Sequence, residues 1–84
     1  MYNILISPGA KKQIDRLSGE SRKRAASILT EILAHDPHAG NALKADLKGL
    51  YSYRFGDYRI IYNIVKHRLI VQILNVMHRR EVYR

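Results

Sequence analysis

Apolar residues in the first half of the chain recur mostly with helical spacing. Only Tyr2–Ser7, at the start, is a short run rich in Ile and Leu that predicts a strand. Ser7-Pro8 is typical of a helix start, with Ser as the N-cap and Pro at the first helical position. Ser18-Gly19 separates this helix from a second one, which ends at Asp36-Pro37 because a residue before proline avoids helical geometry. The first half therefore predicts one strand and two amphipathic helices.

In the second half, the period changes from that of a helix to that of a strand. After a loop at 38–49, alternating residues predict three strands, at 50–55, 58–65 and 69–76. Gly56-Asp57 suits a two-residue hairpin turn between the first two of these strands. The order β-α-α-β-β-β predicts a single α+β domain over residues 1–84. Its two N-terminal helices would pack on one face of a mostly antiparallel four-stranded sheet.

The tight turn at Gly56-Asp57 predicts that Arg54 lies directly opposite Arg59. Like charges facing each other across a ladder destabilise a sheet by a few tenths to about 1 kcal/mol. A chain that accepts this penalty gains from holding two guanidinium groups in one place. The alternative is that both long side chains extend into water, where salt screens their repulsion.

The last hairpin adds a third arginine to this pair. With a three-residue turn, Asn75 lies opposite Arg59, and the end of the strand carries His78 and Arg79 close to the same place. Three guanidinium groups around a cleft can hold a phosphate and stabilise charge that develops on a phosphoryl group. The register therefore predicts a phosphate-binding cluster at one end of the sheet, made by Arg54, Arg59 and Arg79.

Both faces of the predicted sheet carry apolar side chains. One face holds Ile60, Tyr62, Ile64, Ile70 and Leu74, and the other holds Ile61, Val65, Leu69, Val71 and Ile73. Tyrosines share the first parity and indicate a core face rather than a base-stacking platform: Tyr51, Tyr53, Tyr58 and Tyr62. Two short helices can cover only one face, so the second predicts a site for a partner. The alternative is that the loop at 38–49 covers it.

Composition narrows the classes of partner. The chain has 15 Lys and Arg against 7 Asp and Glu, a formal charge of +8, which favours a nucleic acid or an acidic protein. No apolar run reaches membrane-spanning length, and the start lacks the pattern of a secretion signal. The absence of cysteine excludes disulfides and thiolate metal sites and fits a cytoplasmic location. Dispersed carboxylates argue against a two-metal nuclease, so we expect no metal and no cofactor.

Two motifs resemble a known family. Gly56–Tyr62 (GDYRIIY) is followed about sixteen residues later by His78–Tyr83 (HRREVY), and Asp46–Gly49 (DLKG) precedes both. Together with length and element order, these residues resemble the RelE branch of the RelE/ParE toxin superfamily. The resemblance implies a metal-free ribonuclease that cleaves mRNA in the ribosomal A site. It also implies an antitoxin that wraps around the toxin and holds it inactive, and the +8 charge suits an acidic antitoxin.

The resemblance also implies roles for particular residues. Lys48 matches a basic residue that contacts phosphate or rRNA, and Ser52 stands where the family has the first of two strand lysines. Arg54 matches the second of these lysines. The matches to the transition-state arginines and to the tail tyrosine are Arg59, Arg79 and Tyr83. In the basic tail, further RNA-binding residues are expected at Arg80 and Arg84.

The resemblance leaves the general base of the reaction unassigned. A guanidinium group does not release its proton in proteins, so Arg54 cannot accept one from the RNA. His78 is one candidate, because histidine titrates near neutral pH. Tyr83 is the other, since surrounding positive charge lowers the pKa of a phenol.

Two other functions fit the same fold. A ParE-like toxin would inhibit gyrase, although the Arg54/Arg59 pair and the His-Arg-Arg tail argue against it. A non-enzymatic RNA-binding module would use the same cations without a reaction.

Overall fold

The structure is a computed structural model that describes residues 1–82 of the chain. The sequence candidates Tyr83 and Arg84 therefore lie outside the described residues. The regular elements are β1 (Asn3–Ile6), α1 (Pro8–Asp15), α2 (Gly19–Ser27), the π-helical turn η1 (Ile28–Leu33), β2 (Asn41–Ala42), β3 (Leu50–Phe55), β4 (Tyr58–Val65), β5 (Ile70–His78) and α3 (Arg79–Val82). Short 3-10 turns lie between them: η2 (Pro37–Ala39), η3 (Ala45–Leu47) and η4 (Lys66–Arg68).

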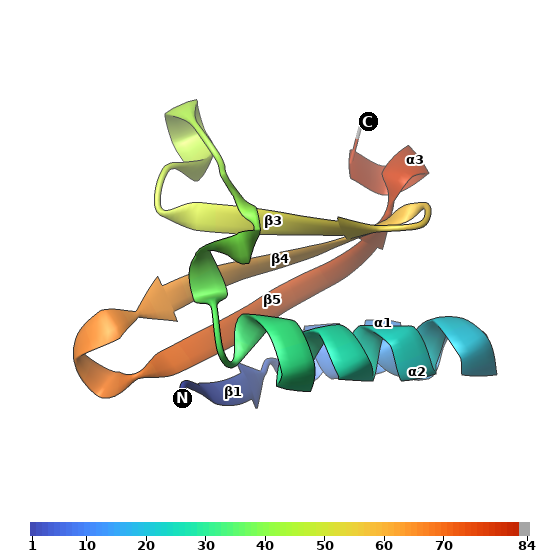
Figure 1. The fold of residues 1–84 in the computed structure, drawn as a ribbon. Coiled ribbons are helices and arrows are strands. Elements are labelled where there is room, and N and C mark those ends of the chain that lie inside the picture. Colours follow the sequence, from blue (N-terminus) through green and yellow to red (C-terminus); the bar gives the residue numbers. More distant parts are fainter. Residues whose placement is uncertain (83–84) are drawn as a thin grey trace.

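The strands form one mixed sheet in the order β1-β5-β4-β3-β2. β1 runs parallel to β5, and the other pairs are antiparallel. Figure 1 shows α1 and α2 on one side of the sheet, with the η3 loop and α3 on the other. The predicted α+β class and helix placement are confirmed, but the sheet has five strands rather than four. The extra strand comes from the predicted loop, where Asn41 and Ala42 pair with β3.

Helices α1 and α2 begin at the predicted serines. Ser7 Oγ accepts a hydrogen bond from the Ala10 N–H at 3.1 Å, and Pro8 occupies the first turn. Ser18 Oγ accepts one from the Ser21 N–H at 3.3 Å. In residues 1–82, no helix is both long and apolar enough to cross a membrane.

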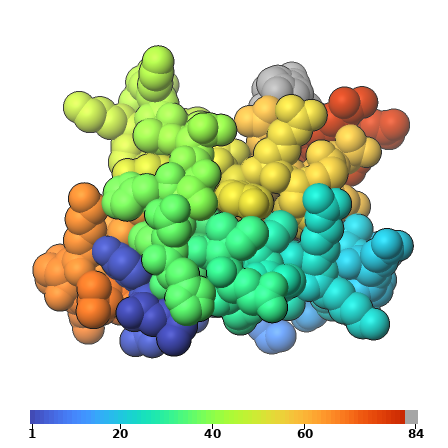
Figure 2. Space-filling view, in the orientation of Figure 1, coloured from blue at the N-terminus to red at the C-terminus, as the bar shows by residue number. Residues whose placement is uncertain are grey.

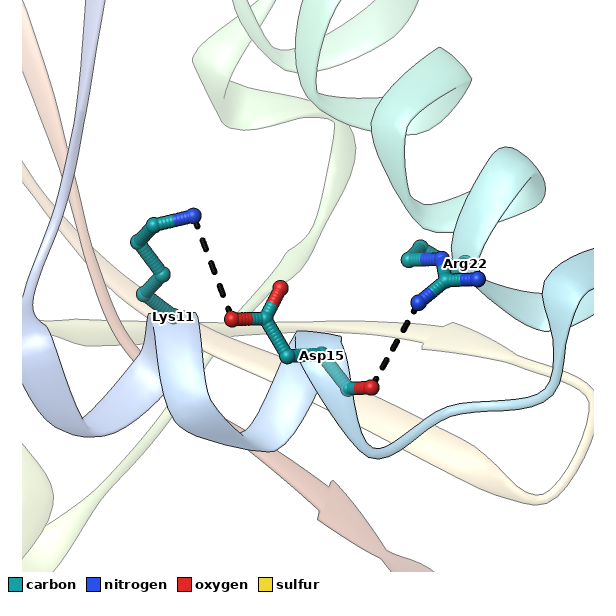
Figure 3. Close-up of polar contacts among 3 residues, drawn as sticks. All are labelled: Lys11, Asp15 and Arg22. Atoms are coloured by element: carbon teal, nitrogen blue, oxygen red, sulfur yellow. Dashed lines mark hydrogen bonds and ion pairs between the residues drawn. The ribbon is translucent and has the colours of Figure 1, made fainter.

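Polar contacts lie at the surface near the junction between α1 and α2 (Figure 3). The Asp15 carbonyl accepts a long hydrogen bond of 3.5 Å from the Arg22 guanidinium, and the Asp15 carboxylate lies 3.9 Å from Lys11 Nζ. These groups are exposed, so they contribute little to stability. The helix pair is positioned mainly by its apolar contact with the sheet.

The core lies between the helix pair and one face of β3, β4 and β5. Its fully buried side chains include Leu33, Ile60, Tyr62, Val71 and Ile73. The expected core role of the tyrosines is confirmed, since Tyr62 is buried and the others pack against the cluster: Tyr51, Tyr53 and Tyr58. This face of the sheet is therefore fully used for folding.

A β-bulge interrupts the pairing of β4 with β5. Tyr62 pairs with Ile73, but its neighbour Ile61 pairs with Asn75, so Leu74 is the extra residue. Helix α1 makes hydrogen bonds to β5 next to the bulge. Gln13 Oε1 accepts a hydrogen bond from the Val76 N–H at 2.7 Å.

Ser7 completes this anchoring of the bulge. Its hydroxyl group donates to the Leu74 carbonyl at 3.2 Å, while the same oxygen caps α1. The start of α1 is thus tied to the point at which β5 changes register. Two side chains of this segment, Ser7 and Gln13, therefore contact β5 at the register change and just beyond it.

The predicted register of the last hairpin is wrong. Met77, not Asn75, lies opposite Arg59. The turn includes Leu69 in the left-handed conformation (φ 53°), so it is one residue longer than predicted, and the bulge at Leu74 adds a second residue. Together, the longer turn and the bulge shift the pairing of β5 with β4 by two residues. Beyond the bulge, each side chain of β5 therefore points to the face that was predicted.

Before the bulge, only the longer turn affects the register of β5. Its side chains there point to the opposite faces from those predicted. Val71 and Ile73 lie opposite Ile64 and Tyr62 on the core face. Ile70 was predicted to lie on the core face, but it pairs with Val65 on the other face. The assignment of these β5 residues from the sequence was therefore wrong, because a one-residue change in a turn exchanges the two faces of a strand.

Tyr62 joins the sheet to the segment that follows the helices. Its hydroxyl group donates to the Pro37 carbonyl at 2.7 Å and accepts from the Gly40 N–H at 3.1 Å. A Cβ atom at Gly40 would collide with this hydroxyl and with the Ser52 carbonyl, so the approach requires glycine. Burial raises the pKa of Tyr62 from its ordinary 10.0 to about 12.

The raised pKa predicts a loss of stability at alkaline pH. The unfolded chain releases the Tyr62 proton first, so stability is complete below pH 10 and falls as the pH rises to 12. Across this window, the free energy of unfolding should fall by roughly 2–3 kcal/mol more in the wild type than in Tyr62→Phe. Urea denaturation of both proteins at several pH values measures this difference. Parallel pH profiles would contradict it.

Two matched variants at Gln13 test its hydrogen bond with the Val76 N–H. Gln13→Met keeps the size of the side chain but leaves the Val76 N–H without its acceptor, which should lower the free energy of unfolding by about 1–3 kcal/mol. Gln13→Glu keeps an acceptor oxygen and should retain most of the stability. Denaturant titration checks both variants, and equal stabilities would show that the contact is not significant.

Candidate functional site

The open face of the sheet carries the predicted arginine pair at its hairpin end. Gly56 (φ 55°) and Asp57 form the turn between β3 and β4, and Arg54 lies directly opposite Arg59. This register confirms the sequence prediction. Arg54 is exposed, whereas Arg59 is half-buried. Both side chains lie on the face away from the helices, because their neighbours in the strands point into the core.

Arg59 lines a hollow of about 280 Å³ on this face. Figure 2 shows the green loop before β3 and the red C-terminal segment rising at either end of the molecule's upper side. The lining is mostly apolar and consists of Leu43, Leu47, Leu50, Ser52, Arg59, Ile61, Asn75, Met77 and Glu81. The loop predicted at 38–49 therefore covers part of the second face. An apolar hollow with a guanidinium group at its side remains.

Arg79 is brought to the same end of the sheet. Its backbone N–H donates to the Asp57 carbonyl at 2.7 Å, which attaches the start of α3 to the hairpin turn. Its Nε atom lies 3.9 Å from the Asp57 carboxylate. The strands of Arg54 and Arg59 meet at this turn, so all three arginines come from one end of the sheet.

His78 lies on the other side of the sheet from the arginine pair. It pairs with Tyr58 in the ladder, and the two rings are in edge contact at 5.3 Å between centroids. Its Nδ1 atom accepts a hydrogen bond from the Arg80 N–H at 3.2 Å. The imidazole borders a separate cavity of about 250 Å³, next to Arg24 and Phe55. The expected proximity of His78 to Arg59 is therefore not found.

The other candidates are spread over the open face. Ser52 is buried in the hollow, with 4 % of its surface exposed. Lys48 is exposed and follows η3, at the end of β3 opposite to the hairpin turn. Arg80 is exposed on α3. The arginine cluster is thus local, whereas Lys48 would contact a long ligand at a different point.

Sequence reasoning missed Glu81 as a residue of the site. Glu81 lies in the hollow that also contains Arg59, and its Oε1 atom accepts a hydrogen bond from the His78 N–H at 3.1 Å. The spacing of these two residues is that of a helix start, in which a carboxylate reaches back three residues. That signal was present in the sequence but was counted only as part of a dispersed acidic set.

The described residues offer positive charge at this site through side chains. Within residues 1–82, no group of three His, Cys, Asp or Glu side chains is placed to hold a metal ion. Guanidinium groups carry a permanent charge and can donate two parallel hydrogen bonds to an oxyanion. The arrangement is suited to binding a phosphodiester.

The like-charge pair predicts a salt-dependent gain in stability. Arg54→Gln should raise the free energy of unfolding by a few tenths to about 1 kcal/mol at low ionic strength, because it removes the repulsion with Arg59. The gain should vanish at high salt, where the charges are screened. Denaturation at two salt concentrations measures this, and an unchanged stability at low salt would show that the two side chains avoid each other in water.

Comparison with known proteins gives the class. A family model described as the ParE toxin of type II toxin–antitoxin systems, parDE, matches residues 4–83. The toxin RelE of Mycobacterium tuberculosis is 32% identical over 84 residues, which cover 99% of this chain and 87% of that protein. The toxin RelG of the same organism is 29% identical, with 99% and 97% covered.

Solved structures agree with these matches. The RelBE2 toxin–antitoxin complex of Mycobacterium tuberculosis superposes with a TM-score of 0.87 at 27% identity, covering 92% of this chain and 96% of that chain. The isolated RelE toxin of E. coli has the same fold, with a TM-score of 0.78 at 21% identity and coverages of 99% and 92%. The protein is a toxin of a type II toxin–antitoxin system. It belongs to the RelE/ParE superfamily, which confirms the resemblance of its two motifs.

Proposed function

We propose that this toxin is an endoribonuclease that cleaves translated mRNA on the ribosome. It acts in the cytoplasm as a single domain over residues 1–84, without a metal ion or cofactor. The observation that carries the proposal is the placement of Arg54 directly opposite Arg59 on an open face, beside a hollow and next to the start of α3 at Arg79. A polyanion with regularly spaced phosphates is the ligand that such a group of guanidinium ions fits.

The reaction proposed for this site is internal transfer at one phosphodiester. The RNA 2′-hydroxyl attacks the adjacent phosphorus, and negative charge develops on the phosphoryl oxygens. Arg59 and Arg79 stabilise this charge, and Arg54 holds the RNA backbone at the hairpin end. Donors placed where charge develops contribute about 10²–10³ each to the rate.

RNA flanking the cleaved bond would contact the remaining basic residues. We assign phosphate contacts to Lys48, at the other end of β3, and to Arg80 and Arg84 in the C-terminal segment. Ser52 is buried in the hollow, so its contact would be made only by a group that enters there. The spread of these residues supports a long, single-stranded ligand.

Proton transfer needs a group that can exchange protons near the arginines. His78 is the weaker candidate, because its ring packs against Tyr58 on the helix side of the sheet. Tyr83 therefore takes the role of proton donor to the leaving 5′ oxygen in this proposal. Arg54 has no part in this transfer, since a guanidinium group keeps its proton.

An antitoxin is the expected protein partner. Structures similar to this chain include complexes described as RelBE and RelE–RelB. The +8 charge favours an acidic antitoxin, and the mostly apolar hollow offers a surface for its nonpolar side chains. Bound there, the antitoxin would cover Arg59 and block access of RNA.

Substitution of the arginines tests the proposal. Arg59→Ala and Arg79→Ala should each lower cleavage of a translated mRNA about 10²–10³-fold, since each removes one stabilising charge. Arg68→Ala is the matched control, because Arg68 is exposed in η4 at the other end of β5. Primer extension after induced expression measures the cuts, and thermal melting checks that each variant is folded. Cleavage by Arg79→Ala at the wild-type rate would reject the assignment.

A gyrase-inhibiting function is the second candidate, because the matching family model is described as a ParE toxin. The same induction experiment separates the two functions. Cuts in phase with codons support the nuclease, whereas a DNA-damage response without cuts supports gyrase as the target. Binding of RNA with neither effect would indicate a non-enzymatic module.

A further inference from the structure

The hollow beside Arg59 contains a carboxylate that the proposed reaction leaves without a role. Glu81 contributes to its lining from α3, while Arg59 contributes from β4. Of the described residues that line the hollow, Glu81 is the one with a carboxylate. The rest are apolar or neutral apart from Arg59, so a group bound here would meet one cation and one anion.

One direct contact holds Glu81, and a second attaches the start of α3 to the hairpin turn. The Glu81 Oε1 atom accepts the His78 N–H at 3.1 Å, and the next residue, Arg79, donates its own N–H to the Asp57 carbonyl at 2.7 Å. The hydrogen bond from His78 uses Oε1, and a carboxylate has a second oxygen, Oε2, that can accept from a ligand. One oxygen therefore fixes the side chain, and the second is available to a ligand.

Other described groups near the arginines are less suited to accept a proton. Guanidinium groups keep theirs. The Asp57 carboxylate lies 3.9 Å from Arg79 Nε at the turn and does not line the hollow. The His78 imidazole faces Tyr58 across the sheet, with Nδ1 already accepting the Arg80 N–H. A carboxylate, in contrast, is ionised at neutral pH and can act as a base.

We propose that Glu81 is the general base of the cleavage reaction, an inference that rests on the proposed function. Its carboxylate takes the proton of the 2′-hydroxyl as the 2′ oxygen bonds to phosphorus. The bond from phosphorus to the 5′ oxygen breaks, and that oxygen takes a proton from Tyr83 or from water. The products are a 2′,3′-cyclic phosphate and a 5′-hydroxyl end. Glu81 then returns its proton to the solvent, and Tyr83, where it was the donor, takes a proton back from the solvent.

Two substitutions at Glu81 separate catalysis from structure. Glu81→Gln keeps an oxygen that accepts the His78 N–H but removes the base, so single-turnover cleavage on programmed ribosomes should fall about 10²–10⁴-fold. Glu81→Ala should fall at least as far. Glu20→Gln, on the helix side of the molecule, is the control for loss of a negative charge and should cleave like the wild type. Thermal melting should be unchanged in Glu81→Gln.

A modified RNA identifies which proton Glu81 moves. Sulfur in place of the 5′ oxygen at the cleaved bond leaves without being protonated, so it rescues the loss of a general acid but not of a general base. The defect of Glu81→Gln should persist on this RNA. Rescue would make Glu81 an acid and overturn the proposal.

Wild-type cleavage by Glu81→Gln would also overturn it, and a defect in Glu81→Ala alone would then leave Glu81 a purely structural role at the start of α3. If the wild type itself makes no cuts, the proposed nuclease function fails, which is a separate outcome. Codon-phased cuts by the wild type together with normal cleavage by Glu81→Gln would support the proposed nuclease function. They would reject only the role of Glu81 as the general base.

Discussion

The contact on which the site depends most is the hydrogen bond from the Val76 N–H to Gln13 Oε1. It gives a partner to a backbone N–H of β5 two residues beyond the bulge at Leu74. Because of that bulge, Val76 joins the core and Met77 faces the open side next to Arg59. A helix on one side of the sheet thus contacts the strand segment whose register places Met77 on the other side.

Local signals in the sequence were sufficient for much of this structure. Ser7 and Ser18 cap the helices, and the Gly56-Asp57 turn places Arg54 opposite Arg59, because a two-residue turn leaves one possible register. The last hairpin could not be predicted in the same way. Leu69 adopts a left-handed conformation that is rare for its residue type. Near the bulge, β5 donates a hydrogen bond to Gln13, which is far away in sequence.

The site was predictable to the same extent. The arginine pair follows from a short-range rule, whereas the place of His78 depends on the parity of β5 at its end. Proximity in sequence to Arg79 suggested a shared location. However, successive strand residues point to opposite faces, and Met77 already lies opposite Arg59 on the open face. Glu81 illustrates the converse. It lies three residues beyond His78, and the short helix α3 carries its side chain back to the open face.

Placing Arg54 opposite Arg59 has a consequence for how the toxin would be controlled. Two cations placed opposite each other in a ladder repel, and an anion that binds both of them reduces this repulsion. RNA and an acidic protein segment would obtain the same relief from the same atoms. Inhibition would then need no change in the shape of the toxin. An antitoxin that imitates the charge of the substrate would suffice, and the two ligands would compete directly for one pair of side chains.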